Sequence, residues 1–89
     1  MNVKEKIADV LIMLYESFGL NEKKELNLLF SREDIAYTAG TTLPQVAIQL
    51  GELEKEALIE RRGNKIIALL KSEGLKEIIS HHNLHYIYK

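Results

Sequence analysis

The chain has 89 residues, of which 46% are hydrophobic and 28% charged, and its net charge at pH 7 is −1. This composition is typical of one small globular domain and excludes an intrinsically disordered protein, and no apolar run reaches the roughly 20 residues that a membrane-spanning helix needs. Because the chain has no cysteine and its charged N-terminus lacks the apolar core of a signal peptide, we exclude a disulfide framework and expect a cytoplasmic protein.

Apolar residues at helical spacing predict a first helix that ends near Gly19, a residue suited to a left-handed cap. Its inward stripe consists of Val3, Ile7, Val10, Leu11, Leu14 and Phe18. Ala8, Ile12 and Tyr15 add apolar surface beside this stripe. They form either the edge of the core, which we favour, or a docking face for a segment outside the chain.

The polar segment after this helix predicts a loop. Beyond it, Leu26, Leu28 and Phe30 recur at every second position, which is the spacing of one face of a strand. The sequence therefore predicts a strand of four or five residues at this place.

A second helix is predicted to begin at Ser31, because Asp34 lies three positions later, where a capping box has its acidic residue. Gly40 follows this helix and accepts the positive φ that a tight turn between two helices requires. The sequence thus predicts two helices that are joined by a glycine turn.

Thr41 or Thr42 is expected to cap the third helix, at about 42–56, and Pro44 in its first turn costs no hydrogen bond. Apolar residues then recur at spacings of four, three and four, which places them on one face of the helix. This buried stripe is predicted to consist of Val46, Leu50, Leu53 and Ala57.

Residues 58–69 contain two apolar-rich runs around a turn signal, which predicts a β-hairpin. A last short helix is expected from about Ser72, although Gly74 in its first turn weakens helix formation. Its inward residues would be Leu75, Ile78 and Ile79. Taken together, residues 1–89 are predicted to form one mainly α domain with a small β-hairpin, a winged helix-turn-helix.

The ordered set of motifs resembles the C-terminal DNA-binding domain of the Crp/Fnr family of bacterial transcription regulators. The segment at 31–36, SREDIA, is similar to the start of the first motif helix in that family, and Gly40 is similar to the glycine that closes it. The segment at 53–60, LEKEALIE, is similar to the family's LEKEGLIE-type entry into the wing. Residues 63–66 match the wing's Gly-x-x-Ile pattern, and residues 3–19 are similar to the helix before the motif.

This resemblance implies a DNA-binding domain whose recognition helix, at about 42–56, enters the major groove and whose wing, at 58–69, contacts phosphate. In the family, an N-terminal domain like a cyclic-nucleotide-binding domain, with a long helix, senses the effector and forms the homodimer. We therefore expect residues 1–89 to be a fragment that lacks this sensor domain. Its partners would be double-stranded DNA and a second copy, and any effector ligand would bind the missing domain.

The family's recognition helix usually begins with Ser or Thr, Arg, Glu, Thr, Val, Ser and Arg, and its Arg and Glu side chains contact base edges. Here the corresponding segment is 42–48, and Leu43, Pro44 and Ile48 occupy the positions of the two arginines and the glutamate. The family's base contacts therefore do not carry over to this chain. An outward Ile48 implies a helix that is slightly rotated or that carries an apolar surface spot.

Other residues remain as candidates for contact with DNA. Glutamine side chains pair well with adenine edges, threonine hydroxyls reach phosphate, and basic residues of the wing and of a helix start commonly contact the phosphate backbone. Each of these side chains can equally be an ordinary solvated residue. The candidates are Arg32, Thr41, Thr42, Leu43, Gln45, Ile48, Gln49, Arg61, Arg62 and Lys65.

The charge balance leaves a second function open. DNA-binding proteins usually carry a basic excess, whereas here acidic residues alternate with the basic ones along the motif. With Leu43 and Ile48 on the recognition helix, the alternative is a protein-interaction or dimerisation module that has lost base readout. Salt-dependent binding to DNA separates the two functions.

The C-terminal tail contains His81, His82 and His85, and imidazole is a good zinc ligand. No cysteine or suitably placed acid accompanies these residues, so we expect no metal site and no cofactor. The chain also lacks a nucleophile paired with a base and a phosphate-binding glycine loop, and we do not expect an enzyme.

Overall fold

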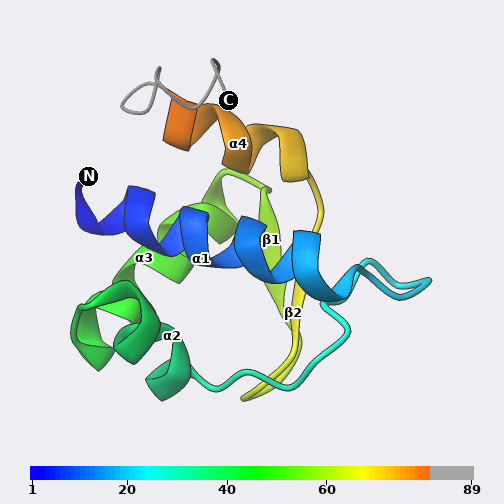
Figure 1. Cartoon of the computed structure of the whole chain (residues 1–89), viewed down its shortest axis with the longest axis horizontal. Helices are drawn as coiled ribbons and strands as arrows, with labels where there is room; N and C mark the ends of the chain where they lie inside the picture. Colours follow the sequence, from blue (N-terminus) through cyan, green and yellow to red (C-terminus); the bar gives the residue numbers. More distant parts are fainter. Residues whose placement is uncertain (81–89) are drawn as a thin grey trace.

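The computed structural model describes residues 1–80, and the histidines of the tail lie outside the described residues. The described part contains four α-helices and one antiparallel hairpin (Figure 1). Within it, no helix combines the length and the apolar character needed to cross a bilayer. The elements are α1 (Val3–Phe18), α2 (Arg32–Ala39), α3 (Leu43–Lys55), β1 (Ile59–Arg61), β2 (Ile67–Leu69) and α4 (Ser72–Ser80).

Helix α1 begins and ends where the sequence predicts. Asn2 caps it in a capping box with Glu5, and Gly19 ends it with φ of 74° and ψ of −175°, a positive φ that is outside the left-handed helical region. α1 packs against α4, α2 and α3, and α4 and α2 lie on opposite sides of it (Figure 1). Ala8 and Ile12 are buried in this packing, so they form the edge of the core. The favoured interpretation is thus confirmed for both residues, whereas the prediction that Phe18 faces inward is wrong, because Phe18 is 53% exposed.

The predicted strand at Leu26–Phe30 does not form. Leu26 donates its backbone N–H to the carbonyl of Ile67, and Phe30 donates to that of Lys65. The five residues 26–30 therefore lie opposite only the three residues 65–67, and no continuous ladder of hydrogen bonds results. One isolated bridge to β2 forms just before the segment, between Glu25 and Ala68, and Leu26 bridges to Leu20. Leu28 and Phe30 pack at the edge of the core.

The helix-turn-helix forms as the sequence predicts. Ser31 and Asp34 make the capping box of α2, and Gly40 has φ of 69° and ψ of 40°, in the left-handed region. Thr42, rather than Thr41, caps α3, and its side chain accepts a hydrogen bond from the backbone N–H of Gln45. These contacts fix where α3 starts and the direction in which it leaves the turn.

Val46, Leu50 and Leu53 are fully buried along α3. The prediction that Ala57 is the fourth residue of this buried stripe is wrong, because Ala57 is exposed and lies beyond the end of the helix with φ of 59°. The N–H of Leu58 bonds to the carbonyl of Leu53, and the N–H of Ala57 bonds to that of Glu54. This is a Schellman ending, in which the position of Ala57 favours glycine.

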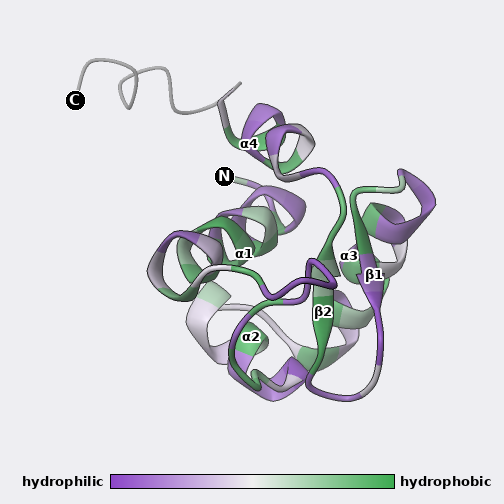
Figure 2. Ribbon diagram, turned by 90° about the vertical axis from the view of Figure 1, so that its right-hand side faces the viewer, coloured by the Kyte–Doolittle hydropathy of each residue, from purple (hydrophilic) through white to green (hydrophobic). Residues whose placement is uncertain are grey.

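The hairpin is shorter than its apolar runs, with Ile59 paired to Leu69 and Arg61 paired to Ile67. All of β2 is buried, whereas Glu60 and Arg61 of β1 are exposed, and Figure 2 shows β2 as hydrophobic and β1 as largely hydrophilic. α4 forms as predicted, with Leu75 and Ile79 buried and Ile78 partly buried. The glycine in its first turn allows a close approach, since a Cβ on Gly74 would lie 2.5 Å from Leu58 Cδ2.

The positive φ of Ala57 leads to a stability prediction. Ala57→Gly should raise the free energy of unfolding by about 0.5 to 1 kcal/mol, because glycine adopts the left-handed region without a Cβ clash. Ala47→Gly, in the interior of α3, is the control and should lower the free energy of unfolding by about 1 kcal/mol. Urea unfolding of both variants measures these changes. Equal destabilisation of the two would show that Ala57 is not strained.

Candidate nucleic-acid interface

The first half of α3 presents an uncharged outward face. Residues 41–51 contain no charged side chain, and Leu43 and Ile48 are 44% and 54% exposed. On a helix, residues four apart lie in one row, so Leu43 and Ala47 form one row and Pro44 and Ile48 form the next. With 3.6 residues per turn, Pro44 and Ile48 lie opposite the buried stripe, whereas Leu43 lies beside it. The apolar face, formed by Leu43, Pro44, Ala47 and Ile48, therefore runs from the edge of the stripe to the solvent side of the helix.

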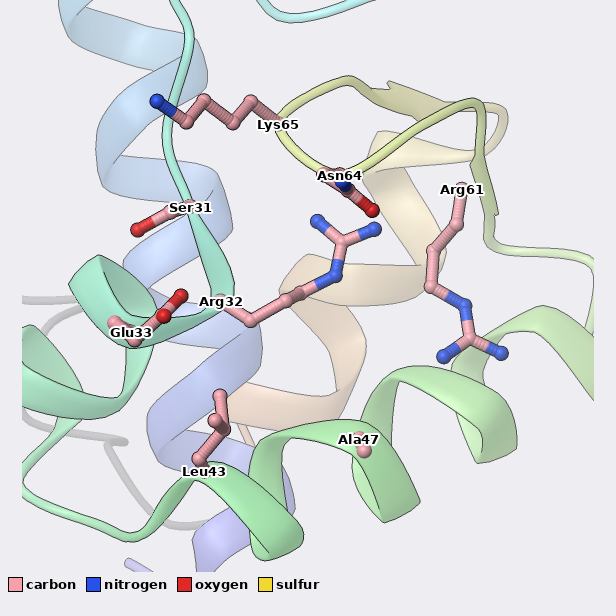
Figure 3. A pocket seen from close by; sticks show the side chains of 8 residues that line it. All are labelled: Ser31, Arg32, Glu33, Leu43, Ala47, Arg61, Asn64 and Lys65. Carbon is pink, nitrogen blue, oxygen red and sulfur yellow. The ribbon is translucent and has the colours of Figure 1, made fainter.

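A pocket of about 510 Å³ separates this helix from the wing. Figure 3 shows Leu43 and Ala47 on α3 at one side of it, the start of α2 at the second side and the wing at the third. The structure thus brings together four candidates that are distant in sequence, namely Arg32, Leu43, Arg61 and Lys65. The complete lining consists of Ser31, Arg32, Glu33, Leu43, Ala47, Arg61, Asn64 and Lys65.

Arg32 connects α2 to the turn of the wing. Its Nη2 donates a hydrogen bond of 2.9 Å to the carbonyl of Gly63, and its guanidinium lies beside Asn64 (Figure 3). Burial, and then the positive charge of Arg61, lower the pKa of Arg32 from its ordinary value. Its Nη1 is buried and has no hydrogen-bond partner among the described residues. Arg32 therefore positions the wing turn over the pocket.

Arg61 anchors the wing to α3. Its Nε and Nη2 donate to Glu54 Oε1 over 3.0 and 2.7 Å, and its backbone N–H donates to Glu54 Oε2 over 2.7 Å. The side-chain hydrogen bond from Arg61, followed by the one from its backbone, lowers the pKa of Glu54. The positive charge of Arg61 is thus offset within the domain.

Arg62 and Lys65 differ in their partners. Arg62 pairs with Glu60, lies 3.3 Å from a carboxylate oxygen of Glu25, and donates 2.7 Å to the carbonyl of Lys23. The hydrogen bond to Glu60 is the main reason why the pKa of Arg62 is raised. Lys65 makes no ion pair within 4.0 Å in the described chain, although its positive charge, after the hydrogen bonds from Ser31, helps to lower the pKa of Asp34. Lys65 is therefore the wing cation that is most available to a phosphate.

The remaining candidates lie at the margin of the apolar face. Gln45 and Gln49 are in one row on its flank, while Thr42 is exposed and uses its hydroxyl oxygen as the helix cap. Sequence reasoning missed four residues of the pocket lining, namely Ser31, Glu33, Ala47 and Asn64. The four-residue spacing from Leu43 is a signal for Ala47, whereas the position of Asn64 beside the Arg32 guanidinium has no local signal (Figure 3).

Comparisons with known proteins agree with this geometry. Residues 5–78 match a family model described as a Crp-like helix-turn-helix domain. No curated protein sequence matches the chain.

Three solved structures are similar. The CO-dependent transcription factor CooA from Carboxydothermus hydrogenoformans is 27% identical with a TM-score of 0.80, and the match covers 89% of this chain and 37% of that one. A CRP/FNR-family transcriptional regulator from Thermus thermophilus is 29% identical, with a TM-score of 0.77 and coverage of 90% and 41%. FixK2 from Bradyrhizobium japonicum is 25% identical, with a TM-score of 0.74 and coverage of 86% and 38%. The chain therefore spans less than half the length of each.

The pair of Glu54 and Arg61 predicts a pH dependence. The lowered pKa of Glu54 means that its ionised form stabilises the fold above the ordinary value of 4.5, and that this contribution is lost as the pH falls through the lowered value. Glu54→Gln should reduce the free energy of unfolding by about 0.5 to 1 kcal/mol at neutral pH, allowing for solvent screening. The difference from wild type should vanish in acid.

Urea unfolding of the wild type and Glu54→Gln, at neutral and at acidic pH, measures this effect. Glu52→Gln is the matched control, since Glu52 is exposed on the same helix and forms no ion pair in the described chain. A destabilisation of Glu54→Gln that is the same at both pH values would refute the electrostatic role.

Proposed function

We propose a mode of DNA binding for this chain, which belongs to the family of Crp-like helix-turn-helix domains. It is a DNA-binding domain of the transcription-regulator type. α3 enters the major groove with its apolar face toward the bases, while the wing contacts phosphate. The observation that carries this proposal is the pocket, which joins the uncharged face of α3 to Arg32 and Lys65.

The charges of the described residues assign different roles to the basic side chains. Lys65 interacts with Asp34 only at longer range, makes no ion pair within 4.0 Å in the described chain, and supplies the main phosphate contact of the wing. Arg61 and Arg62 are held by carboxylates, so they act mainly as anchors of the wing. With a net charge of −1, one domain binds DNA weakly, and two linked domains gain affinity by avidity.

The lengths of the similar regulators lead us to extend the proposal from this domain to a longer protein. The three solved regulators are longer, and this chain spans 37 to 41% of their lengths. We therefore propose that the domain acts in the cytoplasm, in a homodimer whose N-terminal region binds any effector. Two domains would then read half-sites about one helical turn apart. Met13 and Phe18, which are exposed on α1, offer apolar surface to that region.

A salt titration tests the proposed phosphate contact. The logarithm of the wild-type affinity for duplex DNA should fall linearly with the logarithm of salt concentration. Lys65→Ala should weaken binding at low salt and reduce the slope by about 1, because one phosphate contact is lost. Lys71→Ala is the matched control, since Lys71 is exposed beyond the end of β2 that lies away from the wing turn. Fluorescence anisotropy measures both quantities.

The same titration also tests the alternative function, a protein-interaction or dimerisation module. No binding to any duplex at low salt, together with self-association that Leu43→Ala and Ile48→Ala abolish, would identify a protein-interaction module. Sedimentation of the same samples measures that self-association. The transcription factor and regulator reported above give no support to this alternative.

A further inference from the structure

The aliphatic side chains of the apolar face of α3 are only about half covered by the described chain. Leu43 and Ile48 are 44% and 54% exposed, and Pro44 and Ala47 beside them are exposed as well. The core is already filled by Val46 and its neighbours on the opposite side of the helix. The apolar face therefore contributes little to folding, and its chemistry is available to a ligand.

The surroundings of the face indicate a ligand that is negatively charged beside an apolar group. Arg32 and Lys65 lie across the pocket from Leu43 and Ala47, and Glu33 is the one acidic residue of its lining. Figure 3 shows that the side chain of Lys65 extends from the wing past Ser31, away from α3. A duplex with its phosphates near Lys65 presents the floor of its major groove to the face. Because Thr42 and the buried stripe fix the start and the rotation of α3, the same side chains meet the bases each time.

Base edges in the major groove are mostly polar, and they differ in one apolar feature. Thymine carries a C5-methyl group there, whereas cytosine, guanine and adenine present hydrogen-bonding groups. An aliphatic side chain that covers a polar edge removes its water without replacing the hydrogen bond, which is unfavourable. The same side chain gains from covering a methyl group.

We infer that this domain selects duplex DNA by its thymine methyl groups, which Leu43, Ala47 and Ile48 cover in the major groove. This inference rests on the proposed function and names the feature that the recognition helix reads. Gln45 and Gln49, in the row beside the face, add hydrogen bonds to adenine, the partner of thymine in the same base pair. The preferred sites are therefore A·T base pairs at the positions facing the first two turns of α3.

Two duplexes that differ only in this methyl group test the inference. One alternates deoxyadenosine with thymidine, and the other carries deoxyuridine in place of thymidine. The 89-residue chain should bind the thymidine duplex more tightly at low salt, by about fourfold for each methyl group covered. Leu43→Ala and Ile48→Ala should each reduce this ratio, and the double variant should bring it close to one. Fluorescence anisotropy at several salt concentrations gives the affinities.

Two control variants separate methyl readout from general binding. Lys65→Ala should weaken binding to both duplexes equally and keep the ratio. Met13→Ala should change neither affinity nor ratio, because Met13 is 46% exposed, much as Leu43 is, but lies on α1 outside the pocket.

Two results would overturn the inference while leaving the proposed function intact. The first is equal, salt-dependent affinity of the wild type for both duplexes. The second is a preference for thymidine that survives in the double variant, since it would then come from the shape of the duplex. Absence of salt-dependent binding to either duplex overturns the proposed function and this inference with it.

Discussion

The burial of one stripe of α3 is the constraint on which the rest of the structure depends. Val46, Leu50 and Leu53 are fully buried, and burial of such side chains contributes about 1.5 to 3 kcal/mol each. Rotating α3 would lose a large part of the roughly 5 to 15 kcal/mol that is typical of a whole domain. The opposite face is therefore fixed in direction, and the turn before α3 and the hairpin after it build the interface around that face.

The wing is held in place by the same charges that would otherwise attract DNA. Arg61 binds Glu54 on α3, and Arg62 binds Glu60 and Glu25. These pairs are partly exposed, so each contributes little stability, but together they set where the wing stands. The consequence is a wing whose arginine charges are largely offset within the domain, and Lys65 is the residue that we propose for the phosphate contact. We therefore expect binding to depend on shape and avidity more than on net charge.

Local signals in the sequence sufficed for most of the fold. The caps at Ser31 and Thr42 and the glycine turn depend on contacts within a few residues, so the pattern predicts them. The prediction of a strand at Leu26–Phe30 failed because its pairing depends on the register of β2, about forty positions away along the chain. The partners of the basic residues also escaped prediction, since no spacing rule links Arg62 to Glu25.

The residues that replace the family's base-contacting side chains are the strongest clue to what this domain reads. An exposed position gains nothing for folding from leucine or isoleucine, and a solvated aliphatic side chain favours association. Core packing therefore does not account for Leu43 and Ile48, whereas the proposed contact with a methyl-bearing groove does. Replacing charged hydrogen-bonding groups by aliphatic ones exchanges readout of polar base edges for readout of shape and methyl groups. The fold can accommodate this exchange because the residues that orient α3 are not the side chains that we propose to face the DNA.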